Sequence, residues 1–234
     1  MEVSTQLLAI IKYELSSLLK SIKSIIIIIF FTLITFLTSK FFAHNEFIMS
    51  QDHSDSVYTS TIKFLFFFLG FIFIAAVSHD ILNKDIEMET IRFLVAKTSR
   101  LNIILGKFFG VYIFWMLCLS VCFFITFLFS GKWPLYDYLS ISIFLFYAIA
   151  FTFLLSITIP KPSLTMLLGI ILGFIIPILG IVATFKSNIW YLLPFKYILP
   201  YFYILKTGFF MLIPLFIGFL LISISLVMLK RKDL

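Results

Sequence analysis

Charged residues are scarce in this sequence. Only 12% of the 234 residues are Asp, Glu, Lys or Arg, whereas about 25% is usual for soluble domains. Hydrophobic residues make up 62% of the chain, and the mean hydropathy is +1.15. A soluble fold could not hide this much apolar surface from water, so the composition excludes an ordinary soluble domain. The net charge of +7 does not indicate nucleic-acid binding, because the 18 Lys and Arg residues are scattered and stand mostly where apolar runs end.

Acidic residues are missing from the long apolar runs. This absence argues against a proton-coupled carrier, which needs an intramembrane Asp, Glu or His relay, and against an intramembrane hydrolase with paired carboxylates. A nucleotide-binding P-loop is missing too, since Phe108 follows Gly106-Lys107 and Leu101 stands where the first glycine should be. We therefore expect no catalytic residue, cofactor or metal on this chain.

Metal-ligating residues are few and irregularly spaced. Cys118 and Cys122 are one helical turn apart in an apolar run, but two soft ligands are too few for a closed tetrahedral site, so we interpret them as packing residues. One polar loop contains five residues that could ligate a metal through carboxylate or imidazole groups: His44, Glu46, Asp52, His53 and Asp55. Their spacing favours a solvated loop, and a surface metal site is the alternative.

Long apolar runs are what the sequence has in abundance. A helix needs about 20 predominantly apolar residues to cross the hydrocarbon core of a bilayer. Six runs meet this requirement, at about 22–40, 60–79, 105–129, 138–159, 163–185 and 208–229. We predict an all-α integral membrane protein with a single transmembrane domain over 1–234. The first run should stay in the membrane, because no small-residue cleavage pattern follows it.

The stretch 4–20 precedes the first run and is amphipathic. Apolar residues share one side of a helix, and Lys12, Ser16 and Lys20 share another. The apolar side consists of Leu7, Leu8, Ile11, Leu15, Leu18 and Leu19. This pattern predicts an interfacial elbow helix. The alternative, an extension of the first span, would bury Lys12 and Glu14 in lipid.

The stretch 187–205 is apolar enough for a seventh span, but Pro194, Lys196 and Pro200 interrupt it. A central lysine costs about 3 kcal/mol on insertion scales. We predict an outer hairpin here, either re-entrant or surface-lying. With six spans and both termini cytoplasmic, most Lys and Arg residues, including every arginine, lie inside, as the positive-inside rule requires.

Residues 80–100 form the one sizeable charged stretch. Acidic residues come early in it and basic residues late, which matches the dipole of a helix. Ile86, Ile91, Leu94 and Val95 supply an apolar side. The pattern predicts a short amphipathic helix on the cytoplasmic face, suited to docking a soluble partner. The alternative is a solvated linker whose charges only set the topology.

A recognisable motif runs through this stretch into the third span. It consists of Glu87, Thr90, Ile91, Arg92, Phe93, Leu94, Ser99, Arg100, Ile104, Gly106 and Lys107. The motif resembles that of type-2 ATP-binding-cassette (ABC) exporter permeases, in which a Glu-x-Gly-Thr-Leu element, a Ser-Arg pair and a Gly-Lys form the helix that couples to the ATPase. The similarity extends to the chain length, the elbow helix, the six spans and the outer hairpin. Two positions depart from the family motif. Glu89 stands where the family usually has glycine. The proline that the family often has just before the Ser-Arg pair is absent, and Thr98 is the residue nearest to that position.

The resemblance implies the membrane-spanning permease subunit of an ABC exporter. The chain would form a dimer with a second permease chain, identical or paralogous, and would dock on a cytosolic ATPase subunit that binds ATP and Mg. The implied ATPase-coupling residues are Glu87, Glu89, Thr90, Arg92, Ser99 and Arg100. The protein would lie in a bacterial cell membrane with both termini cytoplasmic.

The cargo and the alternative function follow from the apolar composition. The chain contains 32 Phe residues, and a Phe-lined cavity would suit a hydrophobic or amphipathic cargo such as a peptide, lipid or drug. The alternative, which we favour for most of them, is that the Phe side chains face lipid. Gly106/Gly110 and Gly169/Gly173 have the spacing of close helix contacts, within one chain or between two. The alternative function is a membrane-embedded enzyme or a receptor-like protein without an ATPase partner.

Overall fold

The computed structural model describes residues 2–44, 54–186, 189–206 and 208–231. These residues form helices and connecting turns, with no β-strand among them. Six helical stretches are long and apolar enough to cross a membrane: Ile22–His44, Tyr58–Glu87, Arg100–Ser130, Leu135–Thr158, Pro162–Phe185 and Phe209–Arg231. The prediction of an all-α integral membrane protein with six spans is confirmed.

The helices follow one another with short connections. In chain order they are α1 (Glu2–Lys20), α2 (Ile22–His44), α4 (Ser54–Phe64), the π-helix η1 (Leu65–Leu69), α5 (Gly70–Ser78), α6 (Asn83–Glu87), α7 (Thr90–Lys97), α8 (Arg100–Ser130), α9 (Leu135–Thr158), α10 (Pro162–Phe185), the 3-10 helix η2 (Trp190–Leu192), α11 (Leu193–Ile198), α12 (Tyr201–Leu205), the 3-10 helix η3 (Phe209–Leu212) and α13 (Ile213–Arg231). The second candidate span is thus built from α4, η1, α5 and α6 together.

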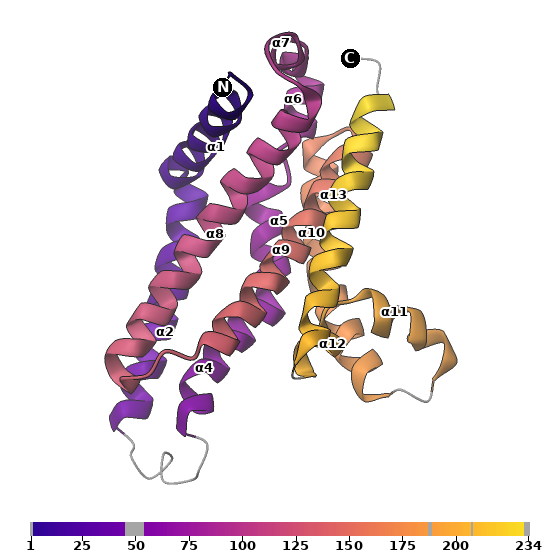
Figure 1. Cartoon of the computed structure of the whole chain (residues 1–234). Helices are drawn as coiled ribbons and strands as arrows, with labels where there is room; N and C mark the ends of the chain where they lie inside the picture. The colour runs from indigo at the N-terminus through magenta and orange to yellow at the C-terminus, as the bar shows by residue number, and fades with distance from the viewer. Residues whose placement is uncertain (1, 45–53, 187–188, 207, 232–234) are drawn as a thin grey trace.

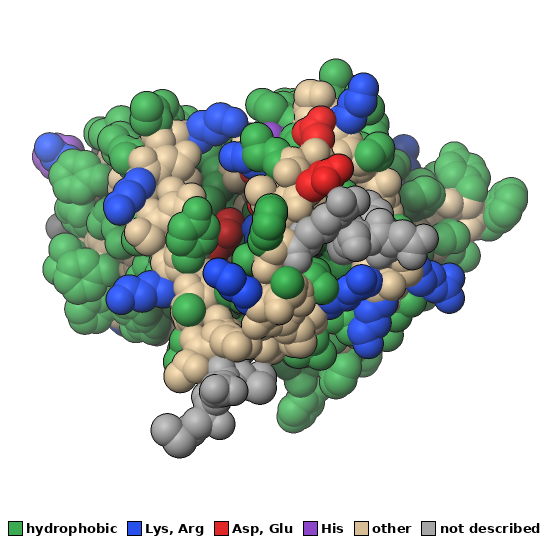
Figure 2. Space-filling view, turned by 90° about the horizontal axis from the view of Figure 1, so that it is seen from above, with side chains coloured by type: hydrophobic (Ala, Val, Ile, Leu, Met, Phe, Trp, Pro, Cys, Tyr) green, Lys and Arg blue, Asp and Glu red, His purple; other side chains and the backbone are tan. Residues whose placement is uncertain are grey.

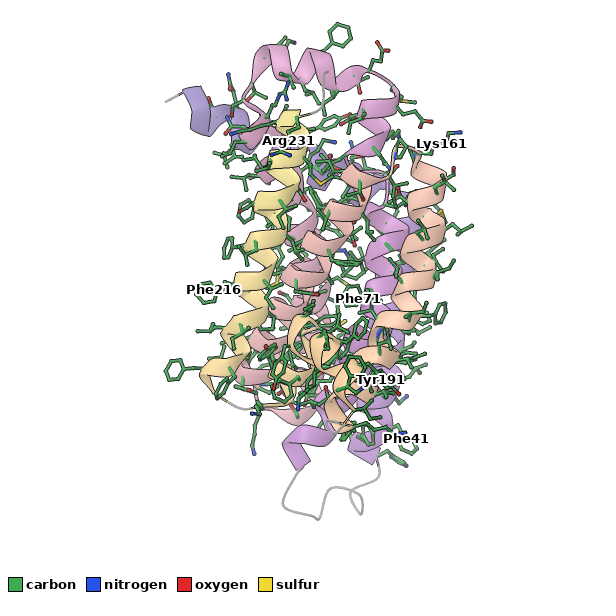
Figure 3. All side chains as sticks on the ribbon, turned by 90° about the vertical axis from the view of Figure 1, so that its right-hand side faces the viewer. Phe41, Phe71, Lys161, Tyr191, Phe216 and Arg231 are labelled. Atoms are coloured by element: carbon green, nitrogen blue, oxygen red, sulfur yellow. The ribbon has the colours of Figure 1, made fainter. Side chains whose placement is uncertain are left out.

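The two ends of the bundle differ. The start of α1, the end of α13, α6 and α7 lie at one end, the upper end in Figure 1, which we call the termini end. Figure 2 looks onto this end and shows Lys and Arg side chains spread across it with acidic side chains between them. Lys161 and Arg231 lie there as well, and α7 crosses the end of the bundle at a steep angle to the spans (Figure 3). The opposite end carries α11 and α12.

Helix α9 lies at the centre of the bundle. Of its most apolar stretch, 78% is buried, against 22% for α2 and 28% for the last span. Aromatic side chains supply much of the contact with α5, where the rings of Phe71 and Phe144 meet edge to face with centroids 5.4 Å apart. Phe216 on α13 instead points away from the bundle (Figure 3). The outer spans therefore present apolar side chains to lipid while α9 forms the core.

Both glycine pairs lie at contacts within this one chain. Gly106 and Gly110 on α8 face α1, where a Cβ at Gly106 would come within 2.7 Å of Ile10. Gly169 and Gly173 on α10 similarly face α5. Small residues at this spacing let the helix axes approach closely. The glycine spacing therefore serves internal packing, and α1 is held along the first turns of α8.

The stretch predicted as an outer hairpin, 187–205, contains short helices in its described part, 189–205. Helices α11 and α12 are separated at Leu199-Pro200, and neither is long enough to cross a membrane. The hydroxyl of Tyr201, at the start of α12, donates to the Phe67 carbonyl at 2.7 Å. This bond fixes α12 against the second span at the end opposite the termini.

Candidate functional site

The connection between the second and third spans is anchored at its start. The hydroxyl of Ser156 accepts hydrogen bonds from the backbone N–H groups of Leu82 and Asn83, both at 3.2 Å. The Asn83 side chain donates to Thr165 Oγ1 at 2.7 Å. All of these polar groups are buried, so water does not compete for these hydrogen bonds. The start of α6 is thereby tied to α9 and α10 at once.

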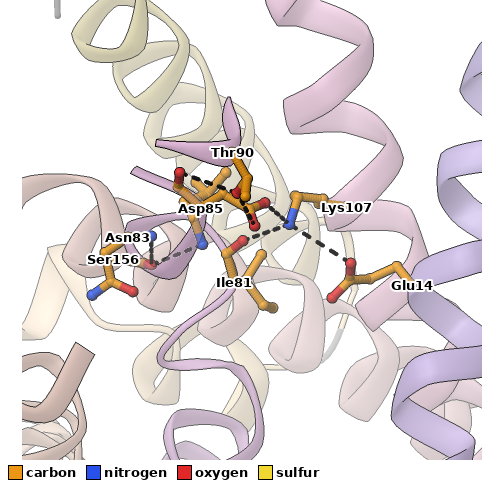
Figure 4. Close-up of polar contacts among 8 residues, drawn as sticks. Glu14, Ile81, Asn83, Asp85, Thr90, Lys107 and Ser156 are labelled. Carbon is orange, nitrogen blue, oxygen red and sulfur yellow. Dashed lines mark hydrogen bonds and ion pairs between the residues drawn. The ribbon is translucent and has the colours of Figure 1, made fainter. Parts of the chain in front are cut away.

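A buried lysine provides the second anchor. The ammonium group of Lys107 lies 2.6 Å from Asp85 Oδ2, donates to the Ile81 carbonyl at 2.7 Å, and lies 3.7 Å from Glu14 Oε2 (Figure 4). Only 9% of Lys107 is exposed. A buried ammonium is stable only when it is paired and hydrogen-bonded. We call Lys107, Asp85, Glu14 and the Ile81 carbonyl the Lys107 node, which joins α1, α6 and α8.

The two carboxylates of the Lys107 node are not equivalent. Burial raises the pKa of Glu14, and the attraction of Lys107 opposes this only in part. The distances agree, because Asp85 is in hydrogen-bond contact with the ammonium group and Glu14 is not. Asp85 is therefore the principal counter-ion of Lys107, and Glu14 is a more distant second one.

Asp85 also holds the start of α7. The hydroxyl of Thr90 donates to Asp85 Oδ1 at 3.1 Å, so one carboxylate bridges Lys107 and Thr90 (Figure 4). Between α6 and α7 the chain turns through Glu89, which has φ +56° and is the one non-glycine residue with positive φ in the described part of the chain. This left-handed conformation is the one that glycine adopts without strain.

Ser99 and Arg100 fix the start of the third span. The Ser99 hydroxyl accepts from the Asn102 N–H at 3.2 Å and caps α8. The Arg100 guanidinium donates to the carbonyls of Leu229 and Lys230, both at 2.8 Å. These carbonyls belong to the last turn of α13, whose C-terminal groups lack helical partners. The Ser-Arg pair thus joins the first turn of α8 to the last turn of α13.

The remaining predicted coupling residues lie at the surface. Glu87, Glu89 and Thr90 are exposed at the termini end, and the side chain of Arg92 lies outside the described residues. The exposed face of α6 and α7 also carries Met88 and Phe93, which are 64% and 75% exposed. The predicted apolar side of this stretch faces inward instead, since Ile91 is 1% exposed.

Two clefts flank the Lys107 node. The larger, of about 580 Å³, lies between α1 and the α7–α8 region, with Tyr13, Phe93 and Leu94 among its lining residues. The smaller, of about 360 Å³, is more polar and includes Ser17, Lys23 and Lys84. Glu14, Asp85 and Lys107 line both clefts. The Lys107 node is therefore the wall between two spaces that adjoin α1.

The sequence did not single out the Lys107 node. Lys107 belongs to the sequence motif and Asp85 is one of several acidic residues in 80–100, but nothing in the sequence pairs them with each other or with Glu14. The available signal was Lys107 itself, which is the one charged residue in the predicted span 105–129 and would need a counter-ion when buried. The packing of α1 on Gly106 and Gly110 brings Glu14 to Lys107, and the anchored start of α6 brings Asp85 to it.

No metal-ligating cluster of three His, Cys, Asp or Glu side chains exists among the residues that the structure describes. Cys118 and Cys122 are buried within α8. Of the polar loop considered as a surface metal site, Glu46, Asp52 and His53 lie outside the described residues.

No protein-family model matches the chain, and a search of curated proteins finds no match either.

Proposed function

We propose that this chain is the membrane-spanning permease subunit of an ABC exporter that moves a hydrophobic or amphipathic cargo. ATP would be hydrolysed on a separate ATPase subunit docked at the termini end, with a second permease chain completing the transporter. This end would be cytoplasmic and the membrane a bacterial cell membrane. The enrichment of Lys and Arg in the segments assigned to this end supports that orientation.

One observation carries the proposal: the stretch around α6 and α7 is bonded to α8, α9 and α10, and through α8 it is linked to α1 and α13. Ser156 and Thr165 connect its start to α9 and α10, and the Lys107 node connects it to α1 and α8. Arg100, just after α7, connects the following turn to α13. A displacement of α6 and α7 would reach these helices through directional contacts, as a two-state domain motion requires.

The exposed face of α6 and α7 has the composition of a docking surface. Met88 and Phe93 stand out from it, and Glu87 and Glu89 flank Met88. Met88 and Phe93 come after Glu87, the last residue of the second candidate span, so their exposed side chains would meet water, not lipid, in the isolated chain. A soluble partner with a pocket for Phe93 and basic groups near Glu87 would cover it.

The test is isolation of the complex. The tagged chain, extracted from its native membrane in mild detergent, should bring down a protein with a P-loop, identified by mass spectrometry. Glu87→Lys and Phe93→Ala should each reduce the recovered ATPase several-fold, because a buried interface contact would be lost. Lys161→Glu is the matched control, since Lys161 is an exposed charge at the same end but on the α9–α10 connection.

Equal recovery of the ATPase from all four forms of the chain would contradict docking at α6 and α7. An enzymatic activity of the purified chain in the absence of any ATPase would favour the alternative, a membrane-embedded enzyme. Recovery of the chain without a P-loop protein, from membranes in which the native genes are expressed, would argue against the whole proposal.

A further inference from the structure

An apolar groove lies at the end of the bundle opposite the termini. It has a volume of about 320 Å³ and lies between the second span, α10 and α12. Phe64, Phe68, Ile181, Phe185 and Leu205 line it, and almost all of its surface is carbon. Phe64 and Phe185 are 61% and 76% exposed, so the groove opens toward the surroundings of the spans.

The π-helix η1 shapes the floor of this groove. A π-helical turn leaves helical carbonyls displaced from the regular pattern, and such turns are frequent at functional sites. Here the Phe67 carbonyl accepts a hydrogen bond from the Tyr201 hydroxyl at 2.7 Å, which holds α12 in place. The rings of Phe64 and Phe68 stack with centroids 5.4 Å apart and an interplanar angle of 7°. The result is a flat aromatic wall of fixed position.

The groove is polarised along its length. Lys63 stands at the outer end, 2.7 Å from Asp137. Lys186 and Lys206 are exposed and directly follow the lining residues Phe185 and Leu205, and the Lys206 ammonium group lies over the rings of Phe202 and Phe210. The exposed aromatic residues Trp190 and Tyr191 precede α11 nearby in the chain, as expected at the level of lipid headgroups. The end of the groove at Lys63 is its mouth: Lys63 lines it, two exposed lysines directly follow lining residues in the chain, and the rest of the lining is apolar.

We propose that this groove binds one acyl chain of an anionic bilayer phospholipid, with the phosphate at the lysine mouth. The groove is bordered by spans, so hydrocarbon is the medium that it meets in the membrane. Its volume is at the low end for a ligand pocket and fits a single chain better than a bulky molecule. The cationic mouth and apolar interior match the two ends of a phospholipid. This site needs no ATPase and does not rest on the function proposed above.

The first experiment uses the unaltered chain. Purified protein is reconstituted in bilayers containing phosphatidylglycerol with a photoactivatable diazirine in its acyl chain, and the labelled peptides are mapped by mass spectrometry. Labelling should concentrate on 64–68 and 181–185, and should fall when the diazirine is carried by phosphatidylcholine. Labelling equal to that of the exposed face of α2, around Ile26 and Leu33, would overturn the proposal, and so would equal labelling by the two lipids.

The second experiment fills the groove. Leu205→Trp should abolish the preferential labelling of 64–68 by the phosphatidylglycerol probe. Leu220→Trp is the matched control, because Leu220 is an apolar residue of α13, 63% exposed, that does not line the groove. Unchanged labelling of the Leu205 variant, or equal losses in both variants, would place the lipid elsewhere. Binding of the ATPase, measured separately, should be the same in both variants.

Discussion

Lys107 Nζ on the third span lies 2.6 Å from Asp85 Oδ2 on α6. This contact makes the segment that follows the second span and the first turns of α8 one unit. Because the Asp85 carboxylate also accepts from Thr90, the same unit extends into α7. Three of the testable consequences below concern how this unit and α1 are held together.

Asp85→Asn should destabilise the protein. The amide keeps the shape of the side chain and can still accept from Thr90, but it leaves the buried Lys107 ammonium without its near counter-ion. Removing one partner of a buried ion pair costs about 3 kcal/mol. The loss would appear as a lower Tm in detergent. Asp80→Asn is the matched control, and an equal loss there would show that the effect is not specific to the ion pair.

Glu14→Gln should leave stability unchanged or raise it, and should alter its pH dependence. Burial raises the pKa of Glu14, with Lys107 opposing and Asp85 and Asp80 adding to the shift. The folded state therefore binds more protons than the unfolded state above pH 4.5, so stability falls as pH rises through the folded pKa. Melting curves should show this decline in the native chain and a shallower one in the variant. An identical pH profile would contradict the assignment.

Glu89→Gly should stabilise the turn between α6 and α7. Glu89 has φ +56°, a conformation that costs a residue with a Cβ roughly 1–2 kcal/mol and glycine little. Glu89→Ala separates this effect from loss of the carboxylate, because alanine removes the carboxylate but keeps the Cβ. We expect a higher Tm for the glycine variant than for the alanine variant. Equal values would mean that backbone strain is not what matters at this position.

Gly106→Ala should loosen α1 from α8. A Cβ at this position would come within 2.7 Å of Ile10 Cγ2, and such overpacking costs about 1–3 kcal/mol, more than the helix propensity gained. Hydrogen exchange of α1 should therefore speed up. Gly70→Ala is the comparison away from α1, because its Cβ would meet a Phe144 ring atom at 3.3 Å and no atom of α1. If the Gly106→Ala variant showed no faster hydrogen exchange of α1, the tight α1–α8 contact would be contradicted.

Much of the architecture was predictable from local pattern. Each span can be recognised by a run of about 20 apolar residues, because a helix that crosses hydrocarbon must meet lipid or protein along its whole length. The interruption of 187–205 by Pro194, Lys196 and Pro200 likewise indicated that no straight span forms there, and the structure has short helices in that stretch.

The coupling motif was predictable only in part. Ser99 and Arg100 stood out as a pair, and their part in coupling stays a prediction, but their bonds to Asn102, Leu229 and Lys230 could not be foreseen. The left-handed turn at Glu89 was hidden as well, because glutamate gives no local sign of positive φ.

By itself, the sequence determined that this is an all-α membrane protein of six spans, because hydrophobic length is a local property of the chain. Tertiary structure alone decided which charges meet. Glu14, Asp85 and Lys107 belong to three different helices, and an ion pair depends on distances of a few ångströms that no sequence spacing sets. The close approach of α1 to α8 across Gly106 and Gly110 brings Glu14 to Lys107, and the anchoring of α6 on Ser156 and Thr165 brings Asp85 there.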